Sequence, residues 1–204
     1  MPLLPMIGKA TAVNVHPLSC YYFGSKAPTL LKDETVHDRL QRMKLNYRVR
    51  GLRTYVEAVM LVELFKHPHL LLLQSRNCVF KLPGGRVRHG ESDIDGLKRK
   101  LSKLLSPSDE ESDWEVEDCI GVWWRADFEA LLDRYMSPAG RAPKECVKVY
   151  LVKLPESRRF IVPRNLKLLA VRLDQAGVLQ TYGDVIAAVP EMLSKFSFSF
   201  ENPC

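Results

Sequence analysis

The stretch GRVRHGESDIDGLKRKLSKLLS, residues 85–106, decides the fold of this chain. It follows a short apolar run that Pro83, Gly84 and Gly85 end, and such a break predicts a strand leading through a loop into a helix. Apolar side chains recur in it at helical spacing, so one face of the helix is expected to pack against a core. That face is formed by Ile94, Leu97, Leu101, Leu104 and Leu105, opposite Lys98, Arg99, Lys100 and Lys103.

The spacing of glycine, acid and arginine in this stretch resembles the Nudix box of phosphate-hydrolysing enzymes. In that box a glutamate follows a glycine by six positions, an arginine comes eight positions later, and three more glutamates follow the arginine. Gly85, Glu91 and Arg99 occupy the first three marks. The positions of the three later acids hold Lys100, Lys103 and Leu104.

These replacements change the local charge from −3 to +2. Mg²⁺ needs oxygen ligands and negative charge around it. At roughly 5 Å and an effective dielectric constant of about 20, each unit of misplaced charge costs on the order of 3 kcal/mol of metal binding. We therefore expect no metal site, no cofactor and no catalytic residues for metal-dependent hydrolysis.

Length and composition predict one globular domain. The 204 residues, 46% hydrophobic and 26% charged, suffice for one core, and we expect an N-terminal extension over residues 1–30 and the domain over residues 31–204. The apolar runs are too short to span a membrane and no leader pattern opens the chain, so a soluble intracellular protein without a membrane partner is expected. The five cysteines show no paired spacing and are expected to be free thiols.

The charge is unevenly distributed. The net charge is +6, and residues 39–53 hold six basic side chains and no acid, whereas residues 109–118, DEESDWEVED, hold seven acids. A basic stripe is typical of a polyanion partner, although a solvated helix face has the same composition.

Periodicity predicts strands and helices in irregular alternation. A helix is expected over residues 34–49 with Asp33 as its N-cap, and a second from residue 184 to 196, interrupted or capped by Pro190. Strands are expected at residues 53–65, 69–74, 78–82, 115–125, 147–153, 159–162 and 167–173, with a turn at His67 and Pro68. This order indicates an α/β (α+β) fold with a mixed sheet flanked by helices.

Nine segments in order resemble the small, Nudix-fold subunit of pre-mRNA cleavage factor I, the cleavage and polyadenylation specificity factor subunit 5 family, over residues 13–198. They are YYFGSK (21–26), DRLQRMKLNY (38–47), GLRTYVEAV (51–59), FKLPGG (80–85), GLKRKL (96–101), DCIGVWWR (118–125), PKEC (143–146), VPRNLKLLAV (162–171) and LSKFSF (193–198).

The resemblance implies a single-domain α/β/α sandwich and a non-catalytic role in pre-mRNA 3′-end cleavage and polyadenylation. It implies a nuclear homodimer that binds single-stranded pre-mRNA at UGUA elements upstream of poly(A) sites. It also implies a larger partner subunit that carries an RNA-recognition (RRM) domain.

The same resemblance implies an RNA-binding site. Arg39 would donate to base edges, Glu57 would accept from base N–H groups, and the Phe80 backbone would hydrogen-bond a uracil, which suits the reading of splayed single-stranded bases. The full set is Arg39, Glu57, Val79, Phe80, Leu82, Tyr182 and Gly183. Each has a structural alternative: an exposed helix arginine, a carboxylate paired with Arg53 or Arg159, a core phenylalanine, and a turn before the last helix.

Two positions depart from the family pattern. Val79 replaces a phenylalanine that stacks on a base, and Leu31 replaces a glutamate that helps read one. A lost aromatic platform costs roughly 1–3 kcal/mol per base. Weaker or less specific UGUA binding than in a typical member is therefore expected.

The resemblance also places partner contacts around Tyr135 and Met192, where the family meets its large subunit, although Asp133 replaces a common aromatic residue. Trp123 and Trp124 alternate along a strand, so at most one is expected in the core.

Two other functions stay open. One is a Nudix hydrolase of nucleoside or dinucleoside polyphosphates with a displaced metal site on Glu91, Asp93 or Asp95, although the two aspartates suit the first turn of a helix. The other is a scaffold subunit that has lost RNA specificity.

Overall fold

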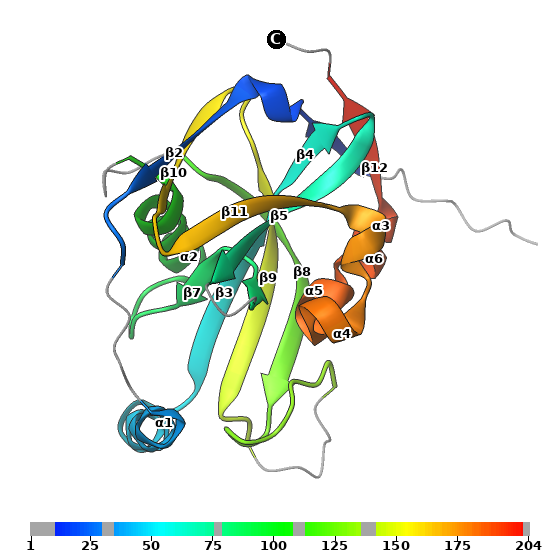
Figure 1. Ribbon diagram of the computed structural model, residues 1–204. Helices are drawn as coiled ribbons and strands as arrows, with labels where there is room; N and C mark the ends of the chain where they lie inside the picture. The colour runs from blue at the N-terminus through cyan, green and yellow to red at the C-terminus, as the bar shows by residue number, and fades with distance from the viewer. Residues whose placement is uncertain (1–10, 30–34, 76–78, 108–112, 136–141, 202–204) are drawn as a thin grey trace, which may run out of the picture.

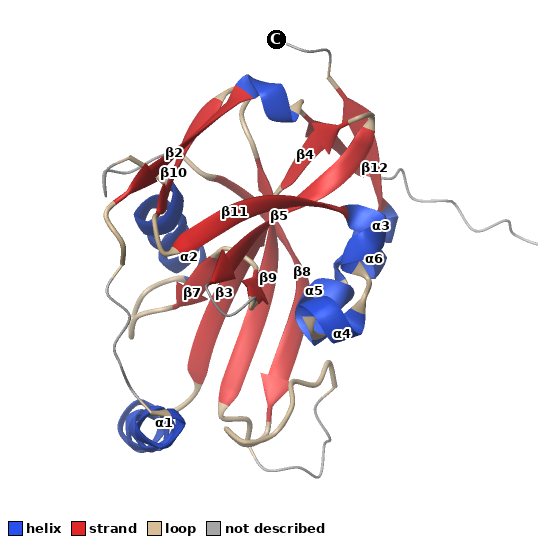
Figure 2. Cartoon of the chain, in the orientation of Figure 1, coloured by secondary structure: helices blue, strands red, loops and turns tan. Residues whose placement is uncertain are grey.

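The computed structural model describes residues 11–29, 35–75, 79–107, 113–135 and 142–201. A mixed sheet lies between helix α2 (Asp93–Leu105) on one face and a group of short helices on the other (Figure 1). The strands fan across the middle of the molecule between these helical layers (Figure 2). The predicted α/β sandwich with a central mixed sheet is confirmed.

The central sheet has the order β7 (Gly84–Arg86), β3 (Arg53–Val59), β9 (Glu145–Lys153) and β8 (Glu115–Arg125). The pair β3 and β9 is parallel, and the two outer pairs are antiparallel. A second sheet has the order β11 (Leu166–Arg172), β5 (His67–Ser75) and β4 (Leu61–Leu64), with β6 (Phe80–Lys81) paired to β5. The short edge strand β7 thus connects the segment FKLPGG, through the loop at residues 87–92, to α2.

Two parallel pairs join the start of the chain to its end. Strand β1 (Thr11–Val15) pairs with β12 (Phe196–Phe200), and β2 (Tyr21–Lys26), which follows the 3-10 turn η1 (Leu18–Cys20), pairs with β10 (Arg158–Pro163). Val13 and Val15 are buried in the core. The described part of the expected extension is therefore built into the sheets, and the domain boundary at residue 30 stays a prediction.

Helix α2 begins at a cap and buries one stripe. The Ser92 hydroxyl accepts a hydrogen bond from the Asp95 amide at 3.1 Å, which fixes the first turn. Leu97, Leu101 and Leu105, four residues apart, are fully buried, and Leu104 is partly buried against the same core. The prediction for Ile94 is wrong: it is 43% exposed, because it lies in the first turn, beyond the buried stripe.

The opposite helical layer consists of single turns. They are α3 (Leu173–Ala176), α4 (Leu179–Tyr182), α5 (Asp184–Ala187), α6 (Val189–Met192) and the 3-10 turn η2 (Leu193–Lys195). The helix expected over residues 184–196 is interrupted at Pro190, as predicted, but the prediction is wrong in its extent. Pro190 lacks an amide proton and stands in the first turn of α6, so the chain restarts there, and residues from Phe196 form β12.

The first helix and the following strands shift by a few residues from the expectation. Helix α1 (Val36–Arg50) is capped by Thr35 rather than Asp33, because the Thr35 hydroxyl accepts from the Asp38 amide. The single strand expected at residues 53–65 divides at Met60 into β3 and β4. The turn lies at Phe65 and Lys66, with φ of 53° and 60°, and not at His67 and Pro68, which belong to β5.

The core has two parts, one on each face of the central sheet. Val56, Leu97 and Trp114 belong to the cluster between the sheet and α2, whereas Val59, Val149 and Ile186 belong to the cluster between the sheet and the short helices. Trp123 is 2% exposed and Trp124 only partly buried, which confirms the alternation predicted for them.

The cysteines are not all free. Cys119 and Cys146 are free, whereas Cys20 is disulfide-bonded, so the expectation of five free thiols is wrong there. Spacing along the chain could not show this pairing, because folding alone decides which cysteines meet.

None of the described helices is long and apolar enough to cross a bilayer.

Candidate RNA interface and basic pocket

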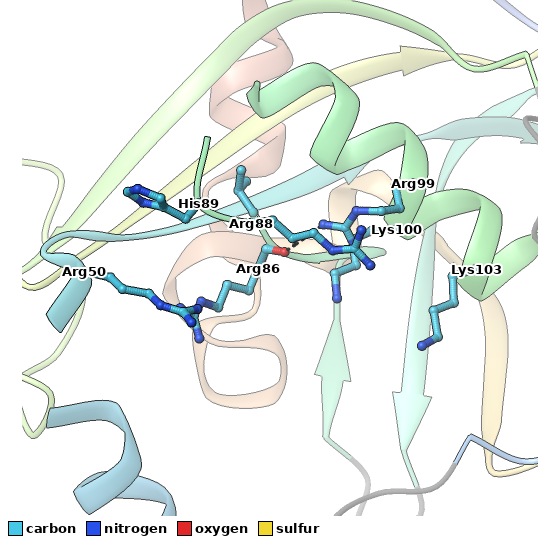
Figure 3. Close-up of a pocket in the computed structure, with 8 residues that line it drawn as sticks. Arg50, Arg86, Arg88, His89, Arg99, Lys100 and Lys103 are labelled. Atoms are coloured by element: carbon cyan, nitrogen blue, oxygen red, sulfur yellow. Dashed lines mark hydrogen bonds between the residues drawn. The ribbon is translucent and has the colours of Figure 1, made fainter. Parts of the chain in front are cut away.

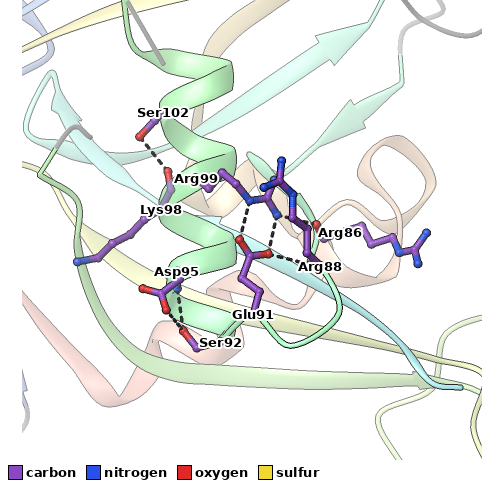
Figure 4. Close-up of polar contacts among 8 residues, drawn as sticks. All are labelled: Arg86, Arg88, Glu91, Ser92, Asp95, Lys98, Arg99 and Ser102. Atoms are coloured by element: carbon purple, nitrogen blue, oxygen red, sulfur yellow. Dashed lines mark hydrogen bonds and ion pairs between the residues drawn. The ribbon is translucent and has the colours of Figure 1, made fainter. Parts of the chain in front are cut away.

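Glu91 and Arg99 form a paired bridge between the loop after β7 and helix α2 (Figure 4). The Arg99 Nε donates to Glu91 Oε1 at 2.6 Å and the Nη2 donates to Oε2 at 2.7 Å. The Arg88 amide donates to the same Oε2 at 2.8 Å, and Arg99 also donates to the Arg86 carbonyl. The carboxylate therefore closes the loop onto the helix.

The hydrogen bonds from Arg99 are the main reason that the pKa of Glu91 falls to about 2, helped by the Arg88 amide and the positive charge of both arginines. The same carboxylate keeps the pKa of Arg99 above its usual value. Glu91 is thus an ionised group whose oxygens are already used by protein donors. In this structure Glu91 therefore has a structural role.

The other two acids of the stretch are engaged elsewhere. Asp93 accepts from the Lys148 ammonium and from the Tyr150 hydroxyl, which ties the start of α2 to β9. Asp95 accepts from the Ser92 hydroxyl at 2.6 Å. Neither aspartate faces Glu91 as a co-ligand, and the described residues contain no group of three or more His, Cys, Asp or Glu side chains that fits a metal ion.

A cavity of about 520 Å³ lies where β7, the following loop and α2 meet the end of α1 (Figure 3). Its charged lining is entirely basic or imidazole: Arg50, Arg86, Arg88, His89, Arg99, Lys100 and Lys103. Burial and then the neighbouring Arg99, Lys103 and Arg88 lower the pKa of Lys100. A divalent cation does not fit this donor set, because ammonium and guanidinium groups stand where carboxylates would hold it.

Sequence reasoning identified Lys100 and Lys103 as lost metal ligands and missed the pocket they help to form. Arg86 and Arg88 flank Val87 in an alternating pattern, which was the signal that two cations point the same way from this segment. Arg50 comes close to Arg86 and Arg88 only when the chain folds. In contrast, Arg53 of the basic stripe is buried and pairs with Glu145 at 3.7 Å, so it is no surface cation.

The predicted base-reading residues divide into a packed group and outlying members. Phe80 and Tyr182, which lie 102 positions apart in the sequence, meet with ring centroids 4.9 Å apart in an edge-to-face contact. Leu82 is buried in the core beneath them, and Tyr182 ends α4 just before Gly183. Gly183 has a φ of 81°, a backbone conformation that favours glycine.

Glu57 lies half-buried on β3, next to the approach of β7. Burial raises the pKa of Glu57 to about 7, against the opposing attraction of Lys81, with a smaller rise from Glu145. Within the described residues neither Arg53 nor Arg159 forms an ion pair with Glu57, and Arg53 pairs with Glu145 instead. Glu57 therefore changes charge near neutral pH.

Arg39 and Val79 are surface residues. Arg39 is exposed on the first turns of α1, and within the described ranges its side chain makes no hydrogen bond to the other predicted residues. Val79 is 48% exposed, and its carbonyl accepts from the Ser75 amide. Leu31 lies outside the described residues. The roles assigned to these positions stay predictions.

Comparisons with known proteins agree with this geometry. The sequence model of the family described as "NUDIX_2: Nucleotide hydrolase" matches residues 11–196. The chain is 56% identical over 190 residues to the pre-mRNA cleavage factor Im 25 kDa subunit 1 of Arabidopsis thaliana, covering 92% of this chain and 86% of the relative. It is 41% identical to the cleavage and polyadenylation specificity factor subunit 5 of Dictyostelium discoideum, over 89% of this chain and 92% of the relative.

The chain belongs to the cleavage factor Im 25 kDa subunit family. The predicted resemblance is thereby confirmed. A solved structure, the Ap4A hydrolase of C. elegans, is similar with a TM-score of 0.46 and 21% identity, over 71% of this chain and 95% of that one.

A surface hollow brings together two of the residues that were predicted to contact a partner subunit. A hollow of about 380 Å³ is lined by Tyr135 and Met192 together with residues 120–122 of β8. Tyr135 is 81% exposed, and the neighbouring Arg134 pairs with Glu191 of α6 at 3.0 Å. The fold thus places the irregular segment and the last helical turns, far apart in sequence, on one face.

Proposed function

We propose that this chain is a non-catalytic RNA-binding subunit of the pre-mRNA 3′-end cleavage and polyadenylation machinery and that it recognises UGUA elements. The observation that carries the proposal is its similarity to cleavage factor Im 25 kDa subunits over almost the whole chain. The absence of hydrolysis is part of the proposal. It is supported by the engagement of Glu91, Asp93 and Asp95 with protein donors.

The contact of Phe80 with Tyr182 and the carboxylate of Glu57 on β3 support the assignment of the RNA site. An aromatic pair offers a face for stacking and a carboxylate offers an acceptor for base N–H groups, the two elements of single-stranded RNA recognition. Arg39 on α1 would supply a hydrogen-bond donor. Val79 offers an exposed aliphatic surface in place of a stacking platform, so moderate affinity is expected.

The assembly follows from the same family. The chain is proposed to act in the nucleus as a homodimer and to bind a larger subunit with an RNA-recognition domain. The face around Tyr135 and Met192 is proposed for the larger subunit, because an exposed aromatic side chain beside a surface hollow is typical of a protein contact.

Fluorescence anisotropy with a UGUA-containing RNA and a scrambled RNA of equal composition tests the function. The UGUA sequence is expected to bind more tightly, and Arg39→Ala should weaken it by roughly tenfold, the value of one charge-assisted hydrogen bond. Arg48→Ala, an exposed arginine on the same helix, serves as the matched control. Equal binding of both sequences would support a scaffold instead, and Mg²⁺-dependent turnover of a dinucleoside polyphosphate abolished by Glu91→Gln would support a hydrolase.

A further inference from the structure

Helix α1 carries apolar side chains on two opposite sides. On the inner side Met43 is buried, and the Tyr47 ring meets the Phe128 ring edge-to-face with centroids 5.9 Å apart. On the outer side Leu45 is 61% exposed and Val49 is 74% exposed. These two residues, the outer stripe, are four positions apart and therefore neighbours on the helix surface. Neither belongs to the core clusters of the described chain.

The surroundings of the outer stripe are positively charged. Residues 39–53 hold six basic side chains and no acid. A hollow of about 460 Å³ runs along α1, and its lining joins Arg42 and Lys44 to one residue of the outer stripe. The acids nearby neutralise little of this charge, since Asp38 accepts from the N-cap hydroxyl at 2.6 Å and the exposed pair of Lys44 with Glu129 is screened by water.

RNA does not account for the outer stripe. Proteins hold single-stranded RNA by stacking bases on aromatic or guanidinium planes and by hydrogen bonds to base edges. Leu45 and Val49 offer neither. Arg39, the predicted base-reading residue of α1, lies about 120° around the helix from Leu45. The outer stripe is therefore a surface for apolar side chains of a protein.

A second copy of this chain does not complement the outer stripe. A two-fold contact would place the stripe of one copy on the same stripe of the other. The basic side chains that flank the stripe would then face their own equivalents, and like charges brought together across an interface repel one another. The partner must instead bring acids to this helix.

The acidic run of this chain lies at the other end of the central sheet. Strand β8 begins in the described part of that run, residues 113–118, and ends at Arg125, which pairs with Glu145. Arg53, the first residue of β3 after α1, is in register with the same Glu145. The length of β8 thus separates this part of the run from α1 by roughly 30 Å, so it cannot cover the outer stripe of its own molecule (Figure 1).

We propose that the outer stripe of α1 is the docking surface for an acidic amphipathic helix of another protein. The apolar face of that helix covers Leu45 and Val49, as in other contacts that an amphipathic helix makes through residues spaced three and four apart. Aspartate and glutamate residues that border this face meet Arg42 and Lys44, which sets the orientation of the partner. This interaction goes beyond the proposed RNA recognition and does not depend on it.

Fluorescence anisotropy of the full chain with a labelled designed peptide tests the proposal. The peptide is about 18 residues long so that it can form a helix, with leucines on one face and glutamates elsewhere. Saturable binding is expected, and the double variant Leu45→Ser, Val49→Ser should weaken it by roughly tenfold or more. Ile94→Ser, which removes another exposed apolar side chain, on α2, is the matched control and should leave it unchanged. A thermal melt shows that each variant is folded.

Two control peptides separate the apolar contact from simple charge attraction. A peptide of the same composition with its leucines scattered off one face should bind at least tenfold more weakly, and one with lysines in place of the glutamates should not bind. Arg42→Glu should weaken the acidic peptide as well. No binding of the acidic peptide, equal binding of the scattered one, or equal weakening by Ile94→Ser overturns the proposal.

Two further measurements identify other occupants of the outer stripe. Light scattering that shows a dimer for the wild-type chain and a monomer for the double variant would assign the stripe to a second copy. Displacement of the peptide by RNA of any sequence, with the double variant weakening that RNA equally, would assign it to RNA. Either result overturns the proposal, whereas an unchanged oligomeric state and undisturbed peptide binding in the presence of RNA support it.

Discussion

Glu91 keeps the position of a motif glutamate but has a structural role in this chain. Its oxygens accept three hydrogen bonds from Arg99 and the Arg88 amide, so the carboxylate holds the loop and helix α2 together. We expect Glu91→Gln to lower the free energy of unfolding by about 2 kcal/mol, the usual value of hydrogen bonds to a charged group. Urea denaturation at neutral pH measures the change.

The pH dependence of that loss has a defined direction. The pKa of Glu91 is about 2 in the folded chain and near 4.5 when unfolded, so its stabilisation is present above pH 4.5 and disappears as the pH falls toward 2. Glu129→Gln, at a mostly exposed acid paired with Lys44, is the control and should change little. An equal loss in both variants would contradict the structural role of Glu91.

The contribution of Glu57 to the stability of the fold depends on pH in the opposite direction. Its pKa of about 7 in the fold exceeds the ordinary 4.5, so the folded chain holds a proton that the unfolded chain has released. Its contribution to stability therefore falls as the pH rises from 4.5 to 7, by at most about 3 kcal/mol. Glu57→Gln should flatten this dependence, so that the substitution raises the free energy of unfolding more at pH 8 than at pH 5. Urea denaturation at both pH values measures the change.

The exposed Glu115 supplies the comparison for Glu57, because Glu115→Gln should leave the same profile unchanged. A wild-type profile that does not fall over this range would mean that Glu57 stays ionised in the fold. It would then act on RNA as a permanent acceptor rather than one that titrates.

At the scale of elements, β7 depends on a close approach of two backbones. A Cβ at Gly84 would lie 2.1 Å from the Val56 carbonyl oxygen and 2.8 Å from the Glu57 Cα. Backbone atoms cannot swing aside, so we expect Gly84→Ala to cost about 3 kcal/mol and to separate β7 from β3. Gly177→Ala is the control, since its nearest neighbour is 3.8 Å away and its φ of −66° suits alanine. Comparable stability of both variants, measured by chemical denaturation, would contradict the packing.

Elements with a strong local signal were the predictable ones. Leucines four residues apart and a serine cap define α2, and its buried stripe follows from them alone. The last helix was predicted too long because helical spacing continues past Pro190, while the pairing of β12 with β1 depends on a strand at the other end of the chain. The turn at Phe65 and Lys66 was missed because neither residue is typical of positive φ.

At the scale of the whole molecule, the chemistry of the sites was less predictable than the fold. The lost metal ligands were visible in the sequence, because the motif has fixed spacing. The contact of Phe80 with Tyr182 was suggested only by family resemblance. Nothing local suggested the convergence of Arg50 with Lys100 and Lys103, since these three residues line one cavity only after folding. The sequence therefore showed the missing acidic side chains more readily than the basic pocket that stands in their place.

The proposed contact with the larger subunit depends on that same assembly of distant segments. Tyr135 stands on the face it shares with Met192, with an apolar ring exposed beside a hollow of about 380 Å³. An exposed tyrosine that inserts into a partner is often a dominant contact, so Tyr135→Ala should weaken binding of the RNA-recognition subunit by roughly tenfold or more. Tyr22→Ala, which removes another exposed tyrosine on β2, is the matched control.

Surface plasmon resonance with the immobilised larger subunit measures both variants, and anisotropy with UGUA RNA is repeated on each. Because Tyr135 lies on β8's side of the molecule and is not part of the Phe80 and Tyr182 group, its loss should leave RNA affinity unchanged. Equal weakening by Tyr22→Ala would place the contact elsewhere. A Tyr135 variant that loses RNA and partner together would mean that the two surfaces are coupled, and the larger subunit would then contribute to RNA recognition through this face.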